Sequence, residues 1–306
     1  MTRKSASVRA RTPGLSSDEH ARVLQVDRQA LEADGVSALD DQVRLDLAAS
    51  EAPARHLVCE SAGGHITGYA HADLRPTDAV VAHLVVAPAS RLHGVGTALL
   101  AELDRVRPEL PLRVWAHGDT PGAQAMAARH GFRRVRELRQ LRLVVRDAPL
   151  STPSYPEQTT VRPFVPGVDD EAWVAVNAAA FRHHPEQGRL SVDDLRQRLA
   201  QPWFDAAGFF VAERAGDMVG YHWTKTHPSE GPGRPKPVGE VYVLGVHPDA
   251  QGLGLGRALT LTGLLHLRQR GLDEVMLYVE SDNLPAIAVY ERLGFTTASV
   301  DVMYAR

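Results

Sequence analysis

The chain has 306 residues, of which 44% are hydrophobic and 23% charged, and its formal net charge is −3. The length is about twice that of a typical domain of roughly 150 residues, and the composition is that of a folded globular protein, so we expect two compact domains. The small net charge, with no cluster of Lys and Arg among aromatic residues, argues against nucleic acid as a partner.

Cys59 is the only cysteine, which excludes an internal disulfide and fits a reducing compartment. No segment reaches the roughly 18 apolar residues of a membrane-spanning helix, and the basic start is not followed by a signal-peptide core. We therefore expect a cytoplasmic protein without a membrane partner, and a monomer by default. The pair His183-His184 is too isolated to form a metal site, and we expect no metal.

The predicted elements alternate between helices and strands. In chain order, helical spacing of apolar residues predicts helices over 18–33, 170–181 and 257–269. Strand patterns predict a hairpin of 209–212 and 218–223, turned at 215–217, followed by strands over 240–246 and 275–279. The order strand, glycine loop, helix, strand predicts a mixed α/β fold that binds a nucleotide.

An internal repeat divides the chain. Residues 84–99 align without gaps on 244–259, and residues 115–132 align on 278–295, each second block ending in Gly-Phe. Between the copies, the Pro- and Ser-rich segment 147–156 cannot sustain a helix or a central strand. We therefore expect an N-terminal domain over 1–147, a linker over 148–158 and a C-terminal domain over 159–306.

The glycine-rich loop Gln251-Gly-Leu-Gly-Leu-Gly256 joins a predicted strand to a predicted helix. Its amide N–H groups would converge at the positive end of the helix, where they attract phosphate oxygens. A turn that merely needs positive φ angles would have the same composition. No Lys-Ser or Lys-Thr pair follows the glycines, as a Walker loop needs.

The pattern Gln/Arg-x-x-Gly-x-Gly/Ala occurs in both copies, at Gln251, Gly254 and Gly256 and at Arg91, Gly94 and Gly96. In this the chain resembles the Gcn5-related N-acetyltransferase (GNAT) superfamily, which implies two tandem GNAT folds, each α/β with a mixed sheet, and acetyl-CoA as co-substrate. The resemblance also implies a bulged strand before the loop, for which Gly245 would suit, with main-chain N–H groups that hold the acetyl carbonyl. By the same resemblance, acetyl-CoA contacts Leu84, Val85, Val86, Leu92, His93, Gly94, Val95, Gly96 and Thr97 in the first copy, and Leu244, Gly245, Val246, Gln251, Gly252, Leu253, Gly254, Leu255, Gly256 and Arg257 in the second.

Acetyl transfer to an amine needs a base more than an acid. An α-amino group has a pKa near 8, so on the order of 90% of it is protonated at neutral pH, whereas a thiol with a pKa of about 8.5 leaves almost unaided. Glu240, at the start of the strand before the loop, is the candidate base, and Tyr290 the candidate acid. A solvated glutamate and a core tyrosine are the alternative interpretations.

The repeat sets Val80 opposite Glu240 and Ala127 opposite Tyr290. The first copy therefore lacks both candidate groups while it keeps the glycine loop. We predict that it is catalytically silent and serves acetyl-CoA binding or structure.

Seven further segments resemble the mycothiol synthase family: 115–119, 135–138, 177–181, 184–188, 222–225, 239–243 and 277–283. This resemblance implies a tandem GNAT enzyme that acetylates the cysteinyl amine of 1D-myo-inositol 2-(L-cysteinylamino)-2-deoxy-glucopyranoside, the last step of mycothiol biosynthesis. It implies that the acceptor is held by Asp41, Glu186, Lys225, Glu240 and Tyr278. It also implies further contacts of acetyl-CoA with Asn283, Leu284, Pro285, Ala286, Ile287 and Ala288.

Several alternatives stay open. The resemblance implies Glu at the position where this chain has Asp41, and Asp40 beside it could take the same role. Lys225 could be a solvated strand end, and Glu186 could belong to a Pro-Gly loop. The acceptor could be another amine, such as an aminoglycoside or a protein N-terminus, or the chain could be a non-catalytic regulatory module that binds acyl-CoA.

Overall fold

The computed structural model describes residues 7–11, 14–49, 51–184, 187–229 and 236–306. The chain forms two compact units, unit 1 with residues 1–139 and 299–306 and unit 2 with residues 140–298. Among the described residues, no helix combines the length and the hydrophobicity needed to cross a membrane.

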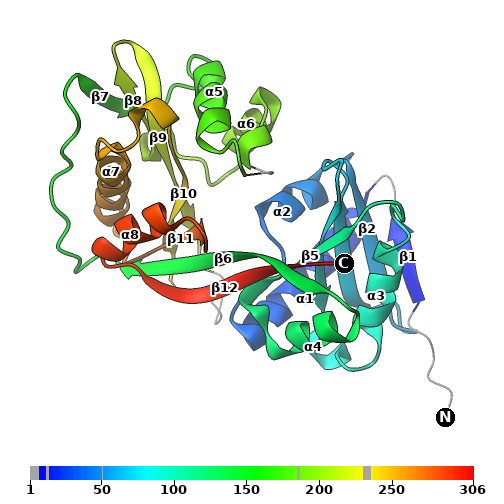
Figure 1. Ribbon diagram of the computed structural model, residues 1–306. Helices are drawn as coiled ribbons and strands as arrows, with labels where there is room; N and C mark the ends of the chain where they lie inside the picture. Colours follow the sequence, from blue (N-terminus) through cyan, green and yellow to red (C-terminus); the bar gives the residue numbers. More distant parts are fainter. Residues whose placement is uncertain (1–6, 12–13, 50, 185–186, 230–235) are drawn as a thin grey trace. The chain divides into compact units, whose positions relative to one another are not determined.

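Unit 1 is a mixed sheet between two helical layers (Figure 1). Its strands follow the order β1-β2-β3-β4-β5-β12, with β4 and β5 parallel and the other neighbours for which a register is known antiparallel. They are β1 (Ser7–Arg11), β2 (Ala54–Glu60), β3 (Ile66–Asp73), β4 (Val80–Val86), β5 (Leu112–Ala116) and the end of β12 (Thr296–Ala305). One face packs on α1 (Ser17–Asp34) and α2 (Asp41–Ala48), the other on α3 (Val95–Leu103) and α4 (Pro121–Arg129).

Unit 2 repeats this plan in the order β6-β11-β10-β9-β8-β7. Its strands are the end of β6 (Arg133–Val144), β7 (Thr159–Pro163), β8 (Phe209–Arg214), β9 (Asp217–His227), β10 (Val238–Val246) and β11 (Glu274–Glu280). One face packs on α5 (Asp170–Ala180) and α6 (Val192–Leu199), the other on α7 (Leu255–Gln269) and α8 (Leu284–Arg292). Single 3₁₀ turns are η1 (Pro88–Ser90), η2 (His117–Asp119), η3 (Gln187–Arg189), η4 (Ala206–Gly208) and η6 (Pro248–Ala250).

The predicted helices 18–33, 170–181 and 257–269 correspond to α1, α5 and α7, and the predicted hairpin to β8 and β9. The domain boundaries differ from the expected ones, because β6 and β12 each run from one unit into the other. Residues 299–306, which we assigned to the C-terminal domain, group with unit 1, where 302–305 of β12 pair with β5. Residues 140–147 group with unit 2, where Leu141, Leu143 and Val145 join its core. A repeat in the sequence does not tell which sheet a strand completes.

A row of buried histidines crosses the sheet of unit 1. His56, His71 and His83 are register partners on β2, β3 and β4, and His117 stacks on His83 with ring centroids 5.3 Å apart. Burial lowers the pKa of His56 and of His83 to about 4. Burial acts in the same direction on His117, but the hydrogen bond and charge of Asp301 outweigh it and raise the pKa of that ring. The folded unit therefore keeps His56 and His83 neutral at neutral pH.

Acid should destabilise the protein before its carboxylates titrate. The unfolded chain protonates His56 and His83 near pH 6.5, as it does His222 of unit 2, whose pKa burial also lowers to about 4. The free energy of unfolding is therefore highest above about pH 6.5 and decreases as the pH falls toward 4. At pH 5 the decrease is about 2 kcal/mol for each of these three histidines. His117 opposes the loss, because its pKa is raised.

We therefore expect the urea unfolding midpoint to fall clearly between pH 7.5 and pH 5. The variant His65→Gln, at an exposed position, should show the same dependence. A midpoint that does not change over this interval would contradict the lowered pKa values of His56, His83 and His222.

Candidate functional site

The loop that joins β10 to α7 has the geometry of an anion site. Gly252 and Gly254 have φ angles of 78° and 82°, which residues with a Cβ rarely adopt, and α7 begins at the next residue. The side-chain amide of Gln251 donates to the Val246 carbonyl oxygen at 3.1 Å and closes the turn. The first N–H groups of α7 have no partner within the helix, so they and the helix dipole are available to phosphate oxygens.

The corresponding loop of unit 1 keeps the same conformation. Leu92 and Gly94 have φ angles of 62° and 84°, and Arg91 Nε donates to the Val86 carbonyl oxygen at 3.3 Å. Leu92 takes the place of Gly252, although the left-handed region costs a residue with a Cβ about 1–2 kcal/mol. Both loops therefore fit a pyrophosphate.

The bulge in β10 lies at Tyr242, so our expectation of a bulge at Gly245 is wrong. Val241 pairs with Thr224 of β9 and Val243 with Trp223, which leaves Tyr242 as an extra residue. Gly245 pairs regularly with Tyr221. A Cβ at Gly245 would lie 2.7 Å from the Tyr221 ring, so this glycine serves the packing of a buried tyrosine.

The bulge also separates β10 from β11. Among the described residues, these parallel strands pair only over 239–241 and 275–277, although both continue further. In unit 1 the register between β3 and β4 is regular, and the parallel pairing of β4 with β5 extends one residue further, to His83 and Trp115. Unpaired N–H and C=O groups on facing strand edges can bind an amide-containing ligand by adding hydrogen bonds to the sheet. The pantetheine arm of acetyl-CoA is such a ligand.

Because unit 1 has no residue equivalent to Tyr242, the gapless alignment of the two copies is shifted by one position for the residues before Tyr242. Glu240 pairs with Met276 of β11, and the equivalent pair in unit 1 is Val81 with Arg113, so Val81 rather than Val80 corresponds to Glu240. Val81 is also apolar. Unit 1 therefore still lacks a carboxylate at this position.

Glu240 is buried near a lysine, two aromatic rings and a histidine. It is 6% exposed and lies directly opposite Lys225 of β9, itself 5% exposed. The Lys225 ammonium lies 4.6 Å from the ring centroid of Trp203 and 5.2 Å from that of Tyr242, within cation–π range. His227 Nε2 donates to Glu240 Oε2 at 2.6 Å. The structure thus contradicts the solvated alternatives for Glu240 and Lys225.

Tyr290 lies on α8 in the core of unit 2, with its ring centroid 5.7 Å from that of Phe295. Burial raises the pKa of Tyr290 to about 12, so the phenol stays protonated at neutral pH. Within the described residues its hydroxyl has no hydrogen-bond partner, and it is not among the fully buried polar atoms that lack one. The side chain can therefore donate a proton to a ligand.

The other predicted site residues are distributed as follows. Tyr278 is 40% exposed on β11 and accepts a hydrogen bond from the Gln140 side chain at 2.7 Å. Asn283 caps α8 by accepting from the Ala286 N–H at 3.2 Å, so residues 284–288 form the first turns of that helix. In unit 1, Asp41 begins α2 after Asp40, which caps the helix and lies 3.4 Å from His83 Nε2. Glu186 lies outside the described residues.

Comparisons with known proteins identify the family. Residues 175–295 match the model of the acetyltransferase (GNAT) family, and residues 52–134 that of a GNAT acetyltransferase domain. The mycothiol acetyltransferase of Thermomonospora curvata is 50% identical over 292 residues, 95% of each chain, and that of Saccharomonospora viridis is 54% identical over 261 residues, 82% of this chain and 84% of the relative. The chain belongs to the mycothiol acetyltransferase family. Like its relatives, it is an acetyl-CoA-dependent N-acetyltransferase.

Solved structures confirm the fold predicted for this mycothiol acetyltransferase family member. A tandem GNAT protein from the clavulanic acid biosynthesis pathway has a TM-score of 0.75 and 20% identity, and covers 98% of both chains. A GCN5-related N-acetyltransferase from Sphaerobacter thermophilus has a TM-score of 0.71 and 21% identity, covering 98% of this chain and 95% of its own. The two tandem GNAT folds with mixed α/β sheets are therefore confirmed.

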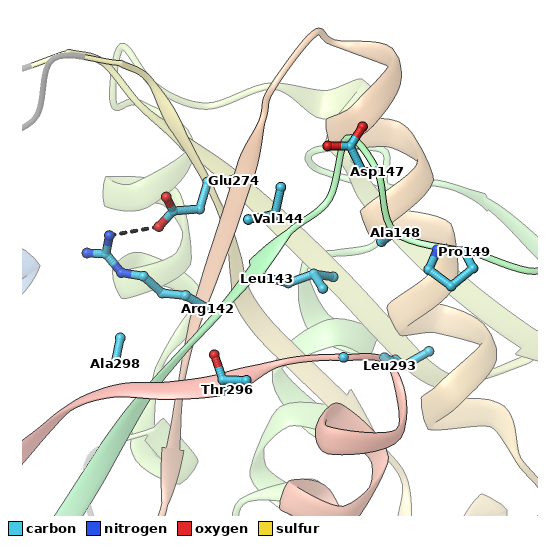
Figure 2. Close-up of a pocket in the computed structure, with 11 residues that line it drawn as sticks. Arg142, Leu143, Val144, Asp147, Ala148, Pro149, Glu274, Leu293, Thr296 and Ala298 are labelled. Atoms are coloured by element: carbon cyan, nitrogen blue, oxygen red, sulfur yellow. Dashed lines mark hydrogen bonds and ion pairs between the residues drawn. The ribbon is translucent and has the colours of Figure 1, made fainter.

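A hollow of about 640 Å³ in unit 2 lies away from the predicted site residues (Figure 2). The ion pair of Arg142 and Glu274, 2.7 Å apart, lines it together with residues of the linker and of β12. None of the predicted acetyl-CoA or acceptor residues contributes to it. In the described parts of the chain, no three His, Cys, Asp or Glu side chains gather as metal ligands would.

The variant Gly254→Ala should weaken acetyl-CoA binding. A Cβ makes the required φ of 82° unfavourable by about 1–2 kcal/mol, so we expect the KM for acetyl-CoA to rise roughly fivefold to thirtyfold. The matched control is Gly216→Ala in the β8–β9 turn, where φ is 92° and, as at Gly254, no atom lies within 4 Å of the added Cβ. An unchanged KM for Gly254→Ala, or an equal rise for the control, would contradict the assignment of the loop.

Proposed function

We propose that the chain transfers the acetyl group of acetyl-CoA to the cysteinyl amine of cysteinyl-glucosaminyl-inositol, the last step of mycothiol biosynthesis. The observation that carries this acceptor is the near full-length similarity to proteins named mycothiol acetyltransferase. A buried carboxylate beside the bulged strand of unit 2 supports transfer to an amine rather than to an acceptor that needs no deprotonation.

In the proposed mechanism, acetyl-CoA supplies an acyl group already activated as a thioester. Glu240 accepts a proton from the ammonium group of the acceptor and leaves the neutral amine able to attack. Main-chain N–H groups of β10 after Tyr242 donate to the carbonyl oxygen on which negative charge develops. Tyr290 donates its phenolic proton to the departing sulfur, a smaller demand because the thiolate leaves readily.

By the family resemblance, the residues proposed to bind the acceptor are Asp41, Glu186, Lys225, Glu240 and Tyr278. A polar, hydroxyl-rich acceptor with a cationic amine calls for carboxylates and a few hydrogen-bond donors, and unit 2 offers these on β9, β10 and β11. Action as a monomer in the cytoplasm stays a prediction.

Unit 1 is proposed to bind acetyl-CoA without turning it over. Its loop has the same φ angles as that of unit 2, which supports binding. Three differences from unit 2 support the absence of catalytic turnover in unit 1. The register of β4 with β3 shows no bulge, Val81 occupies the position of Glu240, and Ala127 occupies the position of Tyr290.

The variant Glu240→Gln should lower turnover by roughly 100-fold to 10,000-fold, because an amide cannot take the amine proton. Steady-state release of CoA thiol measures this directly. Glu274→Gln is the matched control, since Glu274 pairs with Arg142 away from the proposed site and should leave turnover normal. Near-normal turnover of Glu240→Gln would refute Glu240 as the base.

The acceptor is tested by CoA release with cysteinyl-glucosaminyl-inositol, simple cysteine amides and an aminoglycoside. We expect kcat/KM for the complete pseudo-disaccharide to exceed that of the other amines by at least about 100-fold, the equivalent of roughly 3 kcal/mol of added contacts. Equal activity with all amines would reject the specific acceptor. Binding of acetyl-CoA without release for any of them would support the regulatory alternative.

A further inference from the structure

His227 is a site residue that the sequence did not reveal. It ends β9 two positions after Lys225, and since side chains alternate along a strand, both lie on the face of the sheet that carries Glu240. Its Nε2 is 2.6 Å from Glu240 Oε2, a short hydrogen bond to a carboxylate oxygen. The side chains of His227 and Glu240 are 16% and 8% exposed.

Within the described residues, His227 is the only side chain that hydrogen bonds to Glu240. The Lys225 ammonium, although directly opposite, lies against the rings of Trp203 and Tyr242. A buried carboxylate with one hydrogen bond has one fixed oxygen and one oxygen open to a ligand. The orientation of the free oxygen, Oε1, therefore depends on His227.

Unit 1 offers an internal comparison. Val81 stands at the place of Glu240, its β3 partner Asp73 stands at the place of Lys225, and two residues further the chain has Arg75, which pairs with Asp46. The histidine is thus present in the unit that has the carboxylate and is replaced where the carboxylate is missing. A purely structural role for the ring would not require this association.

We propose that His227 is a positioning residue for acetyl transfer: it donates through Nε2 to Oε2 of Glu240 and leaves Oε1 as the oxygen that takes the proton of the acceptor amine. This proposal rests on the proposed role of Glu240 as the base. In the step, the N–H bond of the ammonium breaks and an O–H bond forms at Oε1, while the His227 N–H bond remains intact. The hydrogen bond restricts the carboxylate to fewer orientations, so a larger fraction of them is suited to proton transfer.

Three substitutions of His227, which differ in how far a hydrogen-bond donor extends toward Glu240, test the proposal. In Gln the amide nitrogen can occupy the position of Nε2, in Asn the donor is one methylene short, and in Ala it is absent. We expect His227→Gln to keep kcat within about threefold and both His227→Asn and His227→Ala to lose roughly 10-fold to 100-fold in kcat, with little change in either KM. His266→Ala is the matched control: that side chain is also 16% exposed and lies 3.7 Å from the carboxylate of Asp205, and it should leave kcat unchanged.

A double variant separates this proposal from the one on which it rests. If His227 acts through Glu240, then His227→Ala should cost nothing further in the Glu240→Gln background. Equal losses in all three His227 variants, normal kcat in all three, or a loss confined to the KM for the acceptor would overturn the positioning role. Normal turnover of Glu240→Gln alone would instead reject the base, whatever the His227 variants do.

Discussion

One extra residue in β10, Tyr242, is the constraint on which the site depends. Side chains alternate between the two faces of a strand, so an inserted residue reverses the alternation on one side of it. Leu244 and Val246 after the bulge pack toward α7, as does Val241 before it. Glu240 is thereby turned to the opposite face, beside Lys225 and the aromatic rings that surround its ammonium. The same insertion ends the pairing with β11 early, so one extra residue gives both a buried carboxylate and an open strand edge.

Unit 1 shows that the glycine loop can occur without the bulge and the buried carboxylate of unit 2. Its glycine loop keeps the unusual φ angles, even with Leu92 at one of them, while β4 alternates regularly and directs His83 to the face that Glu240 occupies in unit 2. There the ring joins a buried histidine row with Asp40 and Asp301 as its acidic neighbours. His83 Nε2 lies 3.4 Å from the carboxylate of Asp40, which also caps α2. The imidazole of His83 therefore already has an acidic partner within unit 1.

The sequence was sufficient for what repeats or follows a motif, namely the two copies and their glycine loops. The roles of Glu240 and Tyr290 stay predictions. The sequence misplaced the bulge, because a glycine in a strand can indicate either a bulge or close packing. At Gly245 the reason is close packing, since the Tyr221 ring leaves no room for a Cβ. It missed His227 because the residue becomes a neighbour of Glu240 only through the antiparallel register of β9 and β10. A gapless alignment likewise could not register the residue added at Tyr242, and so it named Val80 where the strand pairing names Val81.

Two strands, β6 and β12, continue along the chain from one unit into the other. Residues after position 139 leave unit 1 along β6, and Leu141, Leu143 and Val145 are buried in the core that also holds Tyr290. The last eight residues of the chain return to unit 1, where Tyr304 donates to the carboxylate of Asp119 and 302–305 pair with β5. Neither sheet is complete without a strand begun in the other copy. The sheet of unit 1 therefore depends on residues 299–306, which follow unit 2 in the chain.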